Sequence, residues 1–213
     1  MRLTKSSVLV FALVLSLAIS AAAQAKVESV SSAPTASEAM TKAVADHAVK
    51  VSAAGTTITI WPAKSIAGEA NAADGALYPD IPRGAFAGII QFSSEAADFR
   101  GQKIPAGTYT LRYATLPSDG NHLGVAPAPD FFLLVPTAND SNPDILLPYP
   151  RLIRLSARAS GTNHPAVFSL QAASKKSPSV ETNEKGHVAV TFDLKIGEKT
   201  LPVALIVVGS AEQ

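Results

Sequence analysis

Alternation of apolar and polar residues is the dominant pattern near the C-terminus of the chain. Over residues 187–196 every second position is apolar, with Val188 and Val190 among them, and residues 201–208 form a second apolar run. Successive side chains of a strand point to opposite faces, so this spacing is typical of a half-buried strand. Because Gly197 opens the short break between the two runs, the pattern predicts an antiparallel hairpin.

Shorter segments of strand composition lie upstream, and prolines separate them. Fourteen of the fifteen prolines lie at or beyond Pro62, and proline interrupts helices, so long helices are not expected there. Strands rich in β-branched and aromatic residues are expected over 56–61, 85–92, 108–114, 131–135 and 166–171. Together with the hairpin, these segments predict a mostly β protein, either a single antiparallel β-sandwich or a partly closed barrel.

One N-terminal helix and one short inserted helix are expected beside the strands. Residues 37–49 place several apolar side chains on one helical stripe, with Ser37 as the N-cap. The inserted helix is predicted over 150–159, because Pro150 suits the first turn and Gly161 suits the end. Three arginines share one face of this helix: Arg151, Arg154 and Arg158. That face is either a ridge that contacts anions or an ordinary solvated surface, and we favour the solvated surface.

The first 25 residues have the pattern of an export signal. Arg2 and Lys5 precede an apolar run, and the segment ends in the small residues that a signal peptidase requires. The run is shorter than the roughly 20 residues that span a membrane, which favours cleavage before Lys26. The predicted organisation is a signal peptide at 1–25, a flexible linker at 26–36 and a single β-rich domain with the N-terminal helix at 37–213. We expect an exported protein, periplasmic or secreted, with no membrane span after cleavage.

Composition excludes several classes of function. The chain contains no cysteine, so disulfides, thiolate nucleophiles, iron–sulfur clusters and zinc–thiolate sites cannot form. Without Arg2 and Lys5 the 18 basic residues fall to 16 against 17 acidic residues, a net charge of about −1. That balance argues against nucleic acid as a partner, because nucleic-acid binding needs a concentrated basic face.

Residues 102–113 contain the clearest local strand signal. Pro105 and Gly107 form a turn that opens the strand. Two alternating sets of residues follow, one with Tyr109, Leu111 and Tyr113 and the other with Thr108, Thr110 and Arg112. If the first set faces the core, Leu111→Ala costs about 2 to 5 kcal/mol and Arg112→Ala costs far less.

Four short motifs between residues 56 and 170 resemble those of a family of exported bacterial proteins of unknown function. They are Asp98-Phe99-Arg100-Gly101-Gln102, the Ile-Pro-x-Gly-x-Tyr-Thr-Leu-Arg-Tyr segment at 104–113, Asp119-Gly120-Asn121-His122, and Gly161-Thr162-Asn163-His164-Pro165. The resemblance implies export and a β-rich body. It supplies no activity, substrate or catalytic residue.

Candidate metal chemistry lies in two polar loops. Asp119 and His122 lie on the first loop, Asp130 follows it at the start of a strand, and His164 lies on the second loop. If the loops meet, these nitrogen and oxygen donors suit a divalent transition metal such as zinc, copper or iron. The alternative is that both loops are ordinary turns. We favour turns, because the sequence contains no His-x-x-x-His or His-Glu-x-x-His spacing.

The sequence also lacks other catalytic motifs. It contains no Gly-x-Ser-x-Gly elbow, phosphate loop or dinucleotide-binding fingerprint, so no catalytic residue and no cofactor is assigned. We therefore expect a noncatalytic exported domain that binds or scaffolds a ligand or protein of the cell envelope. The alternative is a metal-binding protein or metal-assisted enzyme that uses the four Asp and His residues of the two loops.

Overall fold

The computed structural model describes residues 26–70, 75–116, 126 and 128–211. The strands in this part of the chain are β1 (Lys26–Val30), β2 (Ala48–Ala53), β3 (Thr56–Pro62), β4 (Phe86–Phe92), β5 (Ala96–Ala97), β6 (Lys103–Ile104), β7 (Gly107–Thr115), β8 (Asp130–Pro136), β9 (Val167–Gln171), β10 (Ser179–Thr182), β11 (Val188–Ile196) and β12 (Lys199–Val208). The helices are α1 (Glu38–Lys42), α2 (Tyr149–Ser160) and a 3-10 turn, η1 (Thr137–Asn139).

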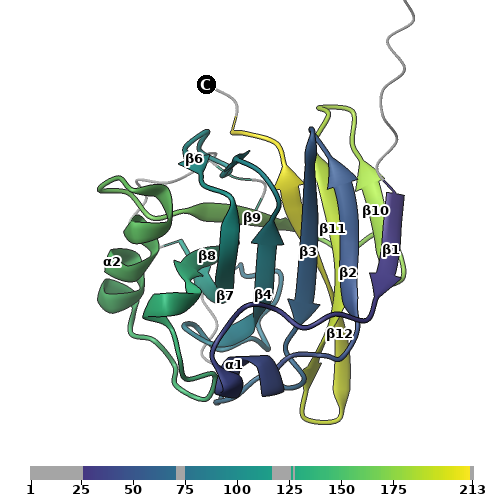
Figure 1. Cartoon of the computed structure of the whole chain (residues 1–213). Coiled ribbons are helices and arrows are strands. Elements are labelled where there is room, and N and C mark those ends of the chain that lie inside the picture. The colour runs from purple at the N-terminus through teal and green to yellow at the C-terminus, as the bar shows by residue number, and fades with distance from the viewer. Residues whose placement is uncertain (1–25, 71–74, 117–125, 127, 212–213) are drawn as a thin grey trace, which may run out of the picture.

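Ten of these strands form one antiparallel sheet that nearly closes into a barrel (Figure 1). Their order is β1-β2-β3-β4-β7-β8-β9-β12-β11-β10, and β5 and β6 form a separate ribbon. β1 and β10 are the two edges of the sheet, yet they contact each other, and β11 also lies against β2 and β3. The prediction of a mostly β protein with a partly closed antiparallel barrel is confirmed, including the C-terminal hairpin of β11 and β12.

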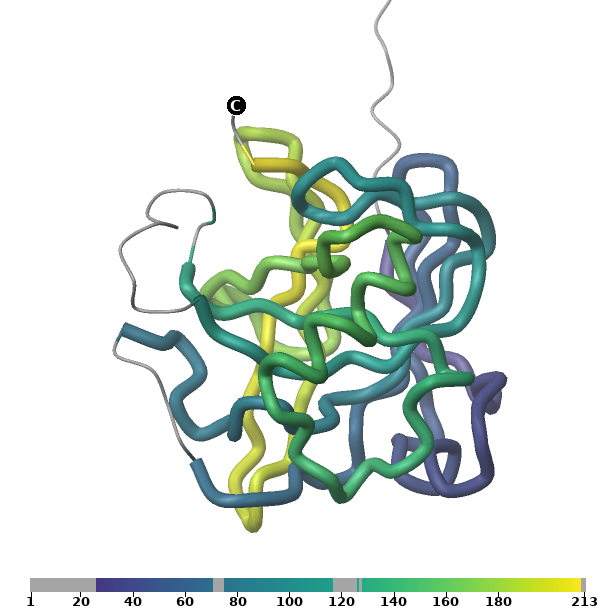
Figure 2. The backbone as a smooth tube through the Cα atoms, turned by 90° about the vertical axis from the view of Figure 1, so that its left-hand side faces the viewer, coloured from purple at the N-terminus to yellow at the C-terminus, as the bar shows by residue number. Residues whose placement is uncertain are grey.

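The uninterrupted apolar run at 131–135 is explained by burial of both faces of β8. Phe132 and Leu134 belong to the main core inside the barrel, whereas Phe131 and Leu133 belong to a second cluster on the outer face. α2 packs on that outer face and adds Leu152 to the second cluster. Figure 2 shows the helix in front of the strands. A strand covered on both sides has no face for polar residues, so its sequence does not alternate.

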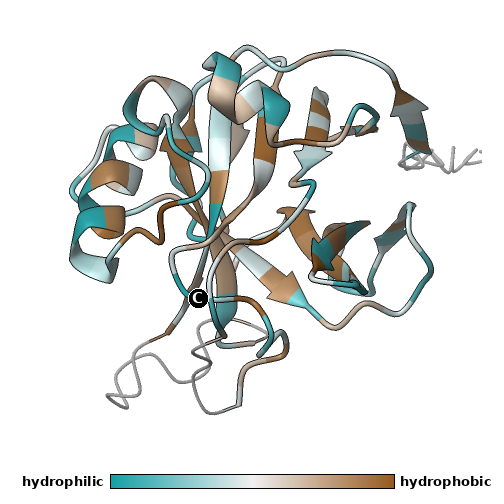
Figure 3. Cartoon of the chain, turned by 90° about the horizontal axis from the view of Figure 1, so that it is seen from below, coloured by the Kyte–Doolittle hydropathy of each residue, from teal (hydrophilic) through white to brown (hydrophobic). Residues whose placement is uncertain are grey.

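α2 closely matches the predicted inserted helix. Gly161 ends it as the C-cap with a φ of 67°, a left-handed conformation that glycine adopts readily. The helix carries both hydrophobic and hydrophilic residues (Figure 3), and Leu152, Ser156 and Ala159 are its buried members. The three arginines named above are exposed, as a solvated face requires. No helix in the described part of the chain is long and apolar enough to span a membrane.

The N-terminal segment differs from the prediction in two respects. The predicted linker over 26–36 contains β1, which pairs with β2 along its whole length. The helix predicted over 37–49 ends at Lys42, although Ser37 caps it as expected by accepting a hydrogen bond from the Met40 amide. Residues 48 and 49 of that stretch belong to β2 instead, because the valines of β2 are buried in the sheet, which β-branched residues favour over a helix.

Arg112 is the clearest departure from the sequence prediction. The strand alternates as predicted, and Leu111 lies in the main core, but the side chain of Arg112 on the opposite face is fully buried as well. Asp140 lies over it and accepts hydrogen bonds from Nε at 2.8 Å and from Nη2 at 2.7 Å. The expectation that Arg112→Ala costs far less than Leu111→Ala is therefore wrong, because alternation along a strand does not reveal what covers its outer face.

Candidate functional site

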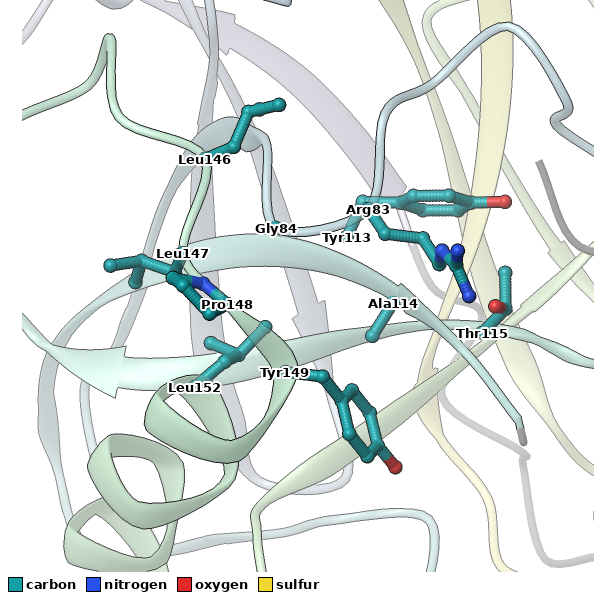
Figure 4. A pocket seen from close by; sticks show the side chains of 10 residues that line it. All are labelled: Arg83, Gly84, Tyr113, Ala114, Thr115, Leu146, Leu147, Pro148, Tyr149 and Leu152. Carbon is teal, nitrogen blue, oxygen red and sulfur yellow. The ribbon is translucent and has the colours of Figure 1, made fainter. Parts of the chain in front are cut away.

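A cavity of about 460 Å³ lies where three parts of the chain approach one another. Its walls are the end of β7 at Ala114 and Thr115, the loop with Arg83 and Gly84, and the start of α2 with the residues before it (Figure 4). The volume falls in the range of roughly 300 to 1,000 Å³ that is typical of small-molecule sites. This cavity is the candidate functional site.

Gly84 allows two of these walls to meet. Its φ is 83°, and a Cβ atom at this position would lie 2.3 Å from the carbonyl oxygen of Leu147. The Gly84 amide donates to the Tyr113 carbonyl at 2.7 Å, and the Gly84 carbonyl accepts from the Leu147 amide at 3.2 Å. The backbone of Gly84 therefore joins β7 to the segment before α2 at a distance that a side chain would prevent.

Arg112 holds the segment that carries Leu147. Nη1 donates to the carbonyls of Gly84 at 3.1 Å and Ile145 at 2.7 Å, and Nη2 donates to the carbonyl of Asn142 at 2.7 Å. These bonds are additional to the pair with Asp140. One buried guanidinium thus connects β7, the Gly84 loop and the residues after η1, and it sets the position of the cavity wall.

The two ends of the cavity differ in polarity. Leu146, Leu147 and Leu152 line one end, whereas Arg83 and Thr115 lie at the other end (Figure 4). Arg83 is exposed. Thr115 is only 3% exposed, and its hydroxyl oxygen has no hydrogen-bond partner among the described residues, as is also true of the buried hydroxyls of Ser169, Ser179 and Thr191. A buried hydroxyl without a partner is unfavourable, and of these four only that of Thr115 belongs to a residue that lines this cavity.

Tyr113 connects the cavity to a buried polar cluster around Asp130. The Tyr113 hydroxyl donates to Asp130 Oδ1 at 2.5 Å, and the amides of Leu77 and Tyr78 donate to the same carboxylate at 2.8 and 3.0 Å. Burial is the main cause that raises the pKa of Tyr113 far above its ordinary value, and the hydrogen bond to Asp130 adds to it, while the charge of Arg83 opposes it. The phenol is therefore neutral at physiological pH.

The four predicted metal ligands are placed as follows. Asp119 and His122 lie outside the described residues. Asp130 is fully buried, and both of its carboxylate oxygens already accept hydrogen bonds, so its role in the structure is to tie the 77–78 segment to β7 and β8. His164 is exposed on the turn after α2. Among the described residues, no group of three or more His, Asp or Glu side chains is arranged to hold a metal ion.

The motif around His164 instead contacts the motif around Asp98. Asp98 is fully buried, and its carboxylate accepts from the amides of Gln102 at 2.8 Å and Val167 at 3.0 Å and from the Gln102 side-chain amide at 2.8 Å. Gln102 also donates to the Pro165 carbonyl and accepts from the Thr162 hydroxyl. These polar residues hold two turns together, which is a structural role.

A second cavity of about 580 Å³ lies between the start of β2, the end of β3 and β11. Its lining includes Asp46 and Lys64, which form an exposed ion pair at 2.9 Å. Partnered, solvated charges of this kind are ordinary surface features. The first cavity is the stronger candidate, because its wall is held by the buried Arg112 and by the Gly84 backbone and one end of it is lined by leucines.

Sequence reasoning did not find the first cavity. Its residues come from segments near 83, 115 and 147–152, and nothing in their spacing shows that they meet. The signal that could have pointed to it is the combination of an Arg-Gly pair after Pro82 with a Pro-rich stretch before α2, since both indicate loops rather than strands. In comparisons with known proteins, no family model, no curated protein and no solved structure matches the chain.

Proposed function

We propose that this protein is an exported, noncatalytic binding protein and that the cavity between β7, the Gly84 loop and α2 is its binding site for a small molecule with an apolar body. The observation that carries the proposal is the cavity itself, with an apolar end and a wall fixed by buried hydrogen bonds. Small-molecule sites are typically concave, mostly apolar and already formed before the ligand binds.

The rigid wall of the cavity supports a binding function. The wall is held by the buried Arg112 and by the Gly84 backbone. The conformational entropy of these groups is lost when the protein folds, before any ligand binds. A ligand that enters therefore meets groups already in place, which lowers the cost of binding. The cavity contains no nucleophile–base pair among its described residues, so binding is the function that its chemistry favours.

The N-terminal pattern is the main support for export. A basic start, an apolar run and small residues before Lys26 are what a secretory signal requires. The motifs at 98–102, 104–113 and 161–165, which resemble those of exported bacterial proteins, support the same proposal. We place the protein in the periplasm or outside the cell.

Fluorescence titration with the uncharged apolar dye N-phenyl-1-naphthylamine tests the binding site. We expect saturable enhancement of emission with one dye per chain. Ala114→Leu, which adds volume to the cavity wall, should weaken dye binding about tenfold or more, as should Tyr149→Ala, which removes an exposed lining ring without disturbing the core.

Ala138→Leu is the matched control, because it adds the same volume at an exposed position of η1. It should leave the dye affinity unchanged. A dye that does not bind, or that binds equally to all four proteins, would contradict the proposed site.

A further inference from the structure

We infer that the outer face of α2 docks on a membrane that contains anionic phospholipid. Arg151, Arg154 and Arg158 contact the lipid phosphates, and the exposed Ile145 and Tyr149 enter the interfacial region. This inference goes beyond the proposed ligand cavity and does not depend on it. Figure 2 shows α2 in front of the strands, with this side of the helix toward the viewer.

The three arginines form one exposed row along α2, the arginine row. Their spacings of three and four residues place them on the same side of the helix. The helical rise separates the first from the last by about 10 Å. All three are exposed, whereas the buried side chains of α2 lie on the side that packs against β8. A flat surface can therefore contact the whole row at once.

Ion pairs do not compensate the charge of the arginine row. In the part of the chain that the structure describes, the exposed salt bridges join lysines to carboxylates, and none involves an arginine of α2. The helix itself contains no acidic residue. Exposure alone suits a solvated face, but such faces usually carry acidic residues three or four positions from the basic ones. The row is thus a concentration of positive charge.

Arg151 lies at the end of the helix where a positive charge is least favourable. α2 begins at Tyr149, and the N-terminus of a helix carries a partial positive charge. A cation is stabilised in the last turn, where Arg158 lies. The stability of the helix therefore does not explain Arg151, whereas contact with a negatively charged surface does.

Arg100 extends the positive surface beyond the C-terminal end of α2. It is exposed on the turn that contains Gln102, and Gln102 bonds to Thr162 and Pro165 in the turn after the helix. Four of the six arginines that follow residue 25 thus lie on α2 or beside it. A guanidinium can donate two parallel N–H groups to one phosphate, so phosphate is the anion that this composition suits.

Exposed apolar side chains at the start of α2 favour a lipid surface over a soluble polyanion. Among the described residues three large hydrophobic side chains are exposed, and two of them are Ile145 at 45% and Tyr149 at 39%. Both lie at the N-terminal end of the arginine row. A soluble polyanion offers them no apolar contact. The interfacial region of a membrane accepts both, because tyrosine prefers that region and aliphatic side chains reach the acyl boundary.

Flotation with lipid vesicles tests the inference. The protein beginning at Lys26 should bind vesicles made of equal parts phosphatidylglycerol and phosphatidylcholine, and it should not bind phosphatidylcholine alone. Raising the ionic strength to about 1 M should release it, because the Debye length falls to roughly 3 Å. The triple variant Arg151→Gln, Arg154→Gln, Arg158→Gln should bind the anionic vesicles at least about thirtyfold more weakly, since each arginine near such a surface contributes about fivefold.

The matched control removes the same charge elsewhere. Lys175→Gln, Lys176→Gln and Lys195→Gln together remove three exposed lysines from other parts of the surface, and this variant should stay within about threefold of the parent protein. Ile145→Ser should weaken vesicle binding about threefold to tenfold without changing binding to soluble inorganic polyphosphate. All of these positions are exposed, so the melting temperatures and the dye affinity of the cavity should match those of the parent.

Three outcomes would overturn the inference. The first is no binding to anionic vesicles, or equal binding to phosphatidylcholine alone. The second is an equal loss in the arginine and lysine triple variants, which would show that net charge rather than the arginine row attracts the membrane. The third is tight binding to polyphosphate together with an unchanged vesicle affinity in Ile145→Ser, which would assign the row to a soluble polyanion.

Discussion

Arg112 and Asp140 form a fully desolvated bidentate pair beneath the wall of the candidate site. The arginine side chain is 0% exposed and the aspartate side chain 4% exposed, with 2.7 Å between Nη2 and Oδ1. Removing one partner of such a pair leaves a buried charge without compensation. The pair therefore matters for stability, although neither residue lines the cavity.

Arg112→Ala should lower the free energy of unfolding by about 3 to 5 kcal/mol, similar to the loss of about 2 to 5 kcal/mol expected for Leu111→Ala. Urea titration followed by circular dichroism measures both values. Arg154→Ala, at an exposed position, serves as the control and should stay within about 0.5 kcal/mol. An Arg112→Ala variant as stable as this control would show that the pair is not formed in solution.

Gly84→Ala should destabilise the protein more than Gly55→Ala does. Both glycines have positive φ, 83° and 76°, so both substitutions carry the strain of roughly 1 to 2 kcal/mol for a left-handed alanine. Only at Gly84 does the new Cβ meet the Leu147 carbonyl, at 2.3 Å, whereas nothing lies within 4 Å of it at Gly55. Thermal unfolding of the two variants should reveal the difference, and equal melting temperatures would contradict the close approach of the two loops.

Stability should fall as the pH rises above about 10, because of Tyr113. Burial, followed by the hydrogen bond to Asp130, raises the pKa of Tyr113 in the folded protein far above the ordinary value of 10.0. The unfolded chain then loses this proton first, so stability is fully present below pH 10 and declines as pH rises above that value.

Urea titrations between pH 8 and pH 11 should show this decline. Tyr113→Phe should make it shallower and should cost about 1 to 3 kcal/mol at neutral pH, because Asp130 loses a buried donor. If the free energy of unfolding of Tyr113→Phe falls with pH as steeply as that of the parent protein, the pKa of Tyr113 is not raised in the folded protein.

Much of the barrel could be predicted from the sequence, because its strands are marked by local patterns. Alternation identified β11, β-branched composition identified β3, and the apolar run identified β8. The sequence did not predict β1 and β2. Their positions depend on pairing with other strands and on the approach of the two sheet edges, which local composition does not encode. The helix predicted over 37–49 is present but ends at Lys42, since the last residues of that stretch pair with β3 and tertiary pairing overrides a weak helical stripe.

The candidate site could not be predicted, because its residues are brought together only by the fold. Arg83 and Thr115 are far apart in the chain, yet both line the cavity. Asp130 is the opposite case, a residue that the sequence singled out. The sequence suggested it as a metal ligand, whereas in the structure its carboxylate accepts hydrogen bonds from backbone amides. A polar residue at the start of a buried strand is ambiguous until its partners are known.

A titration of the isotope-labelled protein with N-phenyl-1-naphthylamine, followed by amide NMR signals, examines the binding site most directly. We expect saturating shifts concentrated at Gly84, Thr115 and Leu147, the residues that surround the cavity. Signals of Asp46 and Lys64 at the second cavity should stay in place. Shifts centred on those two residues, or no saturable shifts at any concentration at which the dye stays dissolved, would show that the cavity beside α2 is not a binding site.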